Sequence, residues 1–154
     1  MINISGSHTF DVPRERVWPR IFDPISLMGL IPGCEEIVQT APGEYQGKLR
    51  LGVAGIRGTY HSLVKIVEEA PPERCCFEGV LSGPTGVIQG QARFTLIDCG
   101  ATSQIQYEAS GVISGALATI NPRFIDRTVE SLVRIGLGCL NKQLKAQSYL
   151  VNEE

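Results

Sequence analysis

Only a few side chains of this sequence could transfer protons near neutral pH. The chain has two histidines, His8 and His61, and histidine is the side chain whose ordinary pKa lies nearest to neutrality. His8 shares the parity of the apolar residues in a segment that alternates with period two, so we expect it to face the interior. There it is either a core histidine with a hydrogen-bond partner or a polar group that orients the headgroup of a ligand. His61 has the outward parity and is expected to face solvent.

The cysteines do not form a recognisable site. They are five in number, include no CxxC pair, and stand at Cys34, Cys75, Cys76, Cys99 and Cys139. The adjacent Cys75 and Cys76 would point to opposite faces of a strand. Because a metal site needs three or four converging ligands, we predict no metal, and reduced, mostly buried thiols of the kind usual in cytosolic proteins.

Other catalytic motifs are absent from the sequence. There is no Gly-x-Ser-x-Gly elbow, and no cysteine has a base at a recognisable spacing. The glycine-rich stretch 52–58 lies between two predicted strands, so it lacks the helix N-terminus that binds phosphate. We therefore predict no catalytic residues and no covalent cofactor.

The composition is that of one soluble domain. The 154 residues are 43% hydrophobic and 19% charged, with a net charge of -2. This charge, without a basic cluster along the sequence, argues against nucleic-acid binding. The N-terminus has no signal-peptide pattern, and no apolar run approaches the roughly 20 residues of a membrane span. We expect a cytoplasmic or peripheral protein.

The hydrophobic periodicity predicts an α+β domain. Residues 2–12 alternate as a strand, two short helices follow at about 15–22 and 25–30, and six more strands fill 36–109, with a hairpin turn at Ala54-Gly55. From 115 the period becomes helical, with one apolar stripe formed by Leu117, Ile120, Phe124, Thr128, Leu132, Ile135 and Cys139. Pro122 should restart this helix behind an Asn121 cap, and the helix should end near Leu144.

The long helix is the only element able to cover one face of so large a sheet. We therefore expect a seven-stranded antiparallel sheet wrapped around it. The domain should span 1–147, and 148–154 should be a short polar tail that frays.

Several motifs resemble one protein family. They are Phe10 to Trp18, Phe22-Asp23-Pro24, Leu30 to Glu35, Gly52 to Gly58, Pro71-Pro72 and Gly111 to Ala118. Together they are similar to the carbon monoxide dehydrogenase G-subunit family, within the START and polyketide-cyclase superfamily, over about residues 1 to 145.

The resemblance implies a helix-grip fold with an internal cavity for a hydrophobic, lipid-like or quinone-like molecule. It also implies a non-catalytic accessory role beside a molybdenum-containing hydroxylase of the carbon monoxide dehydrogenase type, at the inner face of the membrane. Family members often have a longer C-terminal extension that reaches a membrane, so we expect only transient membrane contact from a chain that ends at Glu154. The alternatives are a helix-grip enzyme of the cyclase, hydrolase or dehydratase kind, and an adaptor without a ligand.

The predicted cavity has a bulky lining and an open centre. In helix-grip folds the segment from Leu27 to Ile31 forms the cavity mouth, where it could move as a lid. Small residues at Gly79, Gly90, Ala92, Ala109 and Gly111 allow either a cavity beside the long helix or close packing against it. We favour the cavity, because small-molecule sites are mostly apolar and preformed. The side chains expected to line the cavity are His8, Trp18, Leu27, Leu30, Ile31, Leu51, Tyr60, Phe94, Tyr107, Ile120 and Phe124.

Overall fold

The computed structural model describes residues 2–53 and 56–152. Its elements follow the expected order of one strand, two short helices, six strands and one long helix. They are β1 (Ile2–Phe10), α1 (Arg14–Ile21), α2 (Pro24–Leu30), β2 (Cys34–Ala41), β3 (Glu44–Val53), β4 (Ile56–Ala70), β5 (Arg74–Gly83), β6 (Gly86–Cys99), β7 (Thr102–Ser114), the 3-10 helix η1 (Gly115–Thr119) and α3 (Pro122–Asn152). The predicted turn at Ala54-Gly55 lies outside the described residues.

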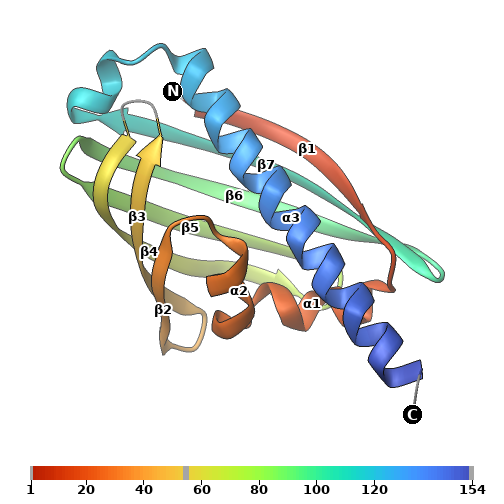
Figure 1. Cartoon of the computed structure of the whole chain (residues 1–154). Coiled ribbons are helices and arrows are strands. Elements are labelled where there is room, and N and C mark those ends of the chain that lie inside the picture. Colours follow the sequence, from red (N-terminus) through yellow and green to blue (C-terminus); the bar gives the residue numbers. More distant parts are fainter. Residues whose placement is uncertain (1, 54–55, 153–154) are drawn as a thin grey trace.

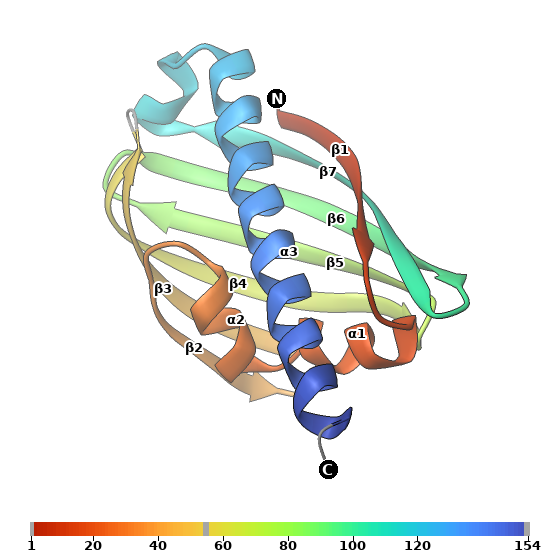
Figure 2. The same cartoon turned by 45° about the vertical axis from the view of Figure 1, so that its right-hand side comes forward.

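The strands form one antiparallel sheet in the order β1-β7-β6-β5-β4-β3-β2. The consecutive hairpins place β2 to β7 side by side, and β1 returns to pair with β7, with Gly6 opposite Tyr107. The sheet curves around α3, and the described helices lie on its concave side (Figures 1 and 2). The α+β helix-grip prediction is therefore confirmed. We call the side facing α3 the inner face and the other side the outer face.

Local chemistry explains where the helices begin. The Asp23 carboxylate accepts hydrogen bonds from the Ile25 backbone N–H (3.1 Å) and the Ser26 hydroxyl (3.0 Å), with Pro24 at the first position of α2. The Asn121 side-chain oxygen accepts from the Arg123 N–H (3.0 Å), so the predicted restart of the long helix at Pro122 is confirmed.

Two predictions about the long helix were wrong. It continues to Asn152, past the expected end near Leu144. Its buried stripe contains Ile125, Leu140 and Leu144, with Val129 and Val133 packed beside them, and differs from the predicted stripe. The helix has apolar residues on two neighbouring sides, and packing against β1 decides which side is buried, because Ile2 and Ile4 lie against Ile125.

The core consists of three apolar clusters, and the second and third share the partly buried Ile88, Ile113 and Ile120. Beside the short helices, Phe10, Val17, Leu30, Phe94, Leu96 and Leu140 form the largest cluster. A second cluster joins Ile2 and Ile4 to Ile125, and a third joins Ile56, Tyr60 and Leu117 at the opposite end of the sheet. No described helix combines the length and the hydropathy needed to cross a bilayer.

Candidate functional site

The middle of the inner face is built from small residues. Strand pairing places Gly79, Gly90 and Gly111 in one row across β5, β6 and β7, and Ala92 and Ala109 beside each other in the next row. A Cβ atom at Gly79 would meet only ordinary contacts, the nearest being 3.6 Å from the Leu63 carbonyl oxygen. We call these five residues the small-residue patch.

The inner face around this patch remains accessible to solvent. Phe77 stands opposite Ala92, and Val64 stands opposite Gly79; both have inward-pointing side chains. Both are only partly buried, whereas Phe94 and Tyr60 nearer the two ends of the sheet are buried. A fully packed interior would bury all four, because core residues of this size normally lose nearly all their exposure. The inner face beside the patch is therefore packed less completely than the two ends of the sheet.

One end of the inner face is aromatic. Trp18, Phe22 and Phe94 contact one another, with ring centroids 5.0 Å apart for Trp18–Phe22 and 5.7 Å for Trp18–Phe94. Leu30 is a buried member of the same apolar cluster, and the half-buried Leu27 packs against that cluster. The α1–α2 turn holds these residues in place, since Arg20 donates to the Ser26 hydroxyl, which is bonded to Asp23.

The opposite end is closed by a different set of predicted lining residues. Tyr60 is fully buried with Leu117, and Leu51 and Ile120 pack against them. The Tyr60 hydroxyl is hydrogen-bonded to the Thr85 hydroxyl. These predicted lining residues therefore form two groups, one on each side of the small-residue patch.

Two of the predicted lining residues with polar groups, His8 and Tyr107, lie where β1 pairs with β7. The Tyr107 ring crosses β1 at Gly6, where a Cβ atom would be 2.5 Å from its hydroxyl oxygen. His8 is half-buried with its ring edge-on to Phe10 (5.4 Å), and its Nε2 is buried without a hydrogen-bond partner among the described residues. His61 is exposed, as predicted.

Two predicted lining residues lie elsewhere. Phe124 is 44% exposed, on the side of α3 away from the core stripe. Ile31 is half-buried just after α2 and belongs to none of the three clusters. Phe22 and Phe77 lie at the aromatic end and beside the patch, although they are not among the predicted lining residues. Phe22 lies four residues after Trp18, one helical turn, and Phe77 has the parity of Cys75 and Gly79, so both could have been found.

The described residues contain no cluster of potential metal ligands. All five cysteines are free. Burial raises the pKa of the Cys75 thiol to about 11, with smaller contributions from Glu69 and Cys76, and burial also raises the pKa of Cys34. Both thiols are therefore protonated near neutral pH and are poor nucleophiles.

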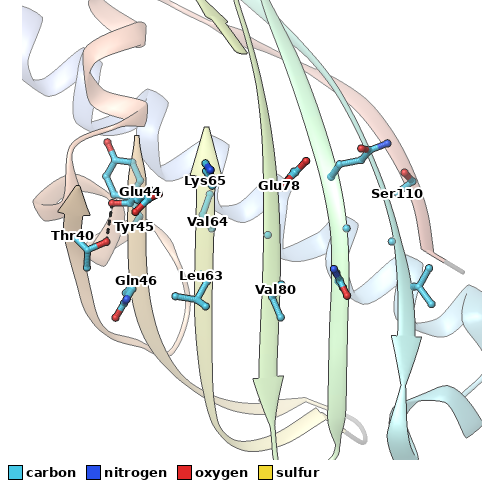
Figure 3. Close-up of a pocket in the computed structure, with 16 residues that line it drawn as sticks. Thr40, Glu44, Tyr45, Gln46, Leu63, Val64, Lys65, Glu78, Val80 and Ser110 are labelled. Carbon is cyan, nitrogen blue, oxygen red and sulfur yellow. Dashed lines mark hydrogen bonds between the residues drawn. The ribbon is translucent and has the colours of Figure 1, made fainter. Parts of the chain in front are cut away.

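The outer face of the sheet carries a shallow hollow of about 670 Å³. Figure 3 shows two rows of side chains across its strands, one with Gln46, Leu63 and Val80, the other with Glu44, Lys65 and Glu78. Leu63 is 54% exposed and no described helix covers this face. Its lining mixes charged, amide and aliphatic side chains.

Comparison with known proteins agrees with this architecture. No curated protein matches the chain. A conserved protein from Geobacillus kaustophilus superposes with a TM-score of 0.90 at 22% identity, covering 94% of this chain and 96% of that one. A START superfamily protein from Mycobacterium smegmatis gives 0.74 at 8% identity, covering 94% and 98%. The Zhui aromatase/cyclase from Streptomyces sp. R1128 gives 0.68 at 16% identity, covering 95% and 94%.

These similarities show a shared fold. The CoxG family, described as the G subunit of carbon monoxide dehydrogenase, matches residues 6–145, which include the small-residue patch and both ends of the inner face. The chain therefore belongs to the CoxG family.

Proposed function

We propose that this protein is a non-catalytic accessory subunit that binds a lipid-like or quinone-like molecule between α3 and the inner face of the sheet. One observation carries the proposal: Phe77 and Val64, although they point inward, are only partly buried beside the small-residue patch. Incompletely buried apolar side chains beside small residues are what a preformed site for a hydrophobic ligand requires.

The side chains around the space suggest which chemistry it would accept. Trp18, Phe22 and Phe94 offer aromatic surfaces on which a flat ring could stack. Tyr107 and His8 could donate hydrogen bonds to a carbonyl oxygen. A ring with one or two carbonyl groups and an apolar tail would match both features, which favours a quinone over a simple acyl chain.

The family membership supports the wider role. The family is named for a component of carbon monoxide dehydrogenase, so we propose that the chain works with a molybdenum-containing hydroxylase of that type. It would do so in the cytoplasm, with transient contact at the inner face of the membrane, where quinones are dissolved.

The single tryptophan provides a direct test. The chain has one Trp, and Trp18 lies in the aromatic end of the space. Titration with decylubiquinone should quench its fluorescence in a saturable way. Quenching that rises linearly, as for free N-acetyltryptophanamide, would contradict binding and favour an adaptor without a ligand.

A matched pair of variants tests whether the ligand binds on the inner face of the sheet. Gly79→Leu would project a side chain into the space and should weaken saturable quenching at least tenfold. Val80→Leu changes the neighbouring residue on the outer face and should leave quenching unchanged. Ala92→Val provides a second inner variant if Gly79→Leu does not fold. Equal effects of the inner and outer changes would argue against the inner site.

An enzyme of the cyclase kind is the second candidate, favoured by the buried Nε2 of His8, which has no partner among the described residues. We expect no turnover of aromatic polyketide, ester or thioester substrates, because no described nucleophile with a lowered pKa accompanies this histidine. Turnover that disappears in His8→Ala, while the protein remains folded, would establish the enzyme instead.

A further inference from the structure

The exposed side of α3 is basic. With a rotation of about 100° per residue, five side chains fall within about 100° of the helix circumference, and each is exposed: Arg123, Arg127, Arg134, Lys142 and Lys145. We call this set the basic face. It extends about 33 Å along the helix, at 1.5 Å per residue, in a chain whose net charge is -2.

The two carboxylates of residues 122–146 lie outside the basic face. They are Asp126 and Glu130, and both are partly buried. By helical rotation they fall beyond one edge of the face, on the side of α3 toward β1, where Glu130 lies with Asn3 and Ser5 beside a hollow. Lys145 pairs with Asp11 across 3.6 Å at one end of the face. The basic face therefore has carboxylates along one edge and at one end, and the exposed side between them carries basic residues.

Exposed apolar side chains border the basic face. On α3, Phe124 is 44% and Ile135 is 52% exposed, and both fall at the edge opposite the carboxylates by helical rotation. The neighbouring α2 packs against α3 and exposes Ile25 (84%) and Met28 (42%). Basic residues beside exposed Phe, Ile and Met side chains are the combination found on surfaces that bind the lipid–water interface.

We propose that the basic face, with its apolar border, docks on the surface of an anionic lipid bilayer. The helix that carries these charges lies across the concave side of the sheet with its other side uncovered (Figure 2), so a flat surface could approach it along its length. Each Lys or Arg near an anionic bilayer strengthens binding severalfold. This assigns a surface to the membrane contact of the proposed function and does not require that the interior bind a ligand.

Vesicle sedimentation tests the docking surface. The full chain should bind phosphatidylcholine vesicles containing about 30% phosphatidylglycerol, more weakly in high salt because salt screens the charges, and should bind pure phosphatidylcholine vesicles poorly. The triple variant Arg123→Gln, Arg127→Gln, Arg134→Gln should lose binding on the order of a hundredfold. The control Arg50→Gln, Arg57→Gln, Lys65→Gln removes the same charge from exposed positions of β3 and β4 and should bind like the wild type.

Equal binding to both vesicle types, or equal losses in both triple variants, would overturn the proposal. Failure to bind anionic vesicles together with binding of the basic face to polyglutamate would reassign the face to an acidic protein. The α3 triple variant should keep the saturable Trp18 quenching by decylubiquinone, since its changed side chains are exposed to solvent. Loss of docking and loss of the interior site are therefore distinguishable.

Discussion

The two faces of the sheet use the same strands for opposite purposes. On β5, Phe77 and Gly79 face α3, whereas Glu78 and Val80 face outward. The inner positions vary from bulky at both ends to small in the middle, and the outer positions mix charged, amide and aliphatic side chains throughout. Alternation lets the sequence shape an interior space with one set of residues and keep the outer surface hydrated with the other set.

The largest expected effect concerns the short helix α2, which shows the same contrast between inner and outer positions. Leu30 is buried in the main cluster, whereas Met28, two residues earlier, is exposed. Leu30→Asp should lower the free energy of unfolding by about 3–5 kcal/mol or more, because it buries an unpaired charge. Met28→Asp should change it by less than about 0.5 kcal/mol.

Urea denaturation of both variants measures the difference. Leu27 is half-buried in the same turn, so Leu27→Asp should lower the free energy of unfolding by an intermediate amount. A stable Leu30→Asp protein would mean that the 27–31 segment moves as a lid, as the sequence suggested, rather than packing as core.

The glycine row sharpens the contrast within one face. A Cβ atom at Gly90 would collide with the Ser110 carbonyl oxygen, whereas Gly79 in the same row has room. Gly90→Ala should therefore destabilise the protein by about 1–3 kcal/mol, and Gly79→Ala should have an effect below about 1 kcal/mol of either sign. Thermal denaturation of the two variants checks this, and equal losses would contradict the close strand approach at Gly90.

Cys75 and its exposed counterpart Cys99 should differ in alkaline solution. Burial raises the pKa of Cys75 from 9.0 to about 11, so between these values the folded state retains a proton that the unfolded state releases. This contribution to stability is complete below pH 9 and should be lost as the pH rises toward 11. Cys75→Ala should remove that part of the slope in denaturation measured from about pH 8 to 11.

Thiol labelling gives an independent readout for the same pair. Mass spectrometry at about pH 8 should find Cys99 modified well before Cys75, and the reverse order would show that β5 opens readily.

The smallest effect concerns the junction of β1 and α3. Asn141 donates to the Asp11 carboxylate (2.9 Å) and accepts from the Asp11 N–H (2.9 Å). The Asn141 hydrogen bond is the main cause that lowers the pKa of Asp11, opposed by burial and assisted by Lys145. Asn141→Ala should raise that pKa toward its ordinary value in an NMR titration. The stability that Asp11 contributes, present above its unfolded pKa and lost as the pH falls, should then decrease.

Much of the fold could be predicted from local patterns. Strand parity indicated an outward position for His61, and the Asp23-Pro24 and Asn121-Pro122 pairs located two helix starts. The stripe of α3 could not be assigned, since Phe124 and Ile125 are both apolar and only contact with Ile2 and Ile4 decides between them. For the same reason the sequence identified small residues in the interior but could not show that three glycines align in one row, which depends on the register of β5, β6 and β7.

The pairing of β1 with β7 also has a consequence for synthesis. Ile2 lies opposite Gly111, and Phe10 opposite Ser103, so the first strand to leave the ribosome pairs with the last. At about 5–20 residues per second, β1 must wait roughly 5–20 s for its partner. During that interval its Ile2, Ile4 and Phe10 side chains have no sheet to cover them, and the alternate Asn3, Ser5 and Ser7 keep one side of the segment hydrated. Chaperone dependence of the newborn chain should therefore be greatest before β7 has emerged.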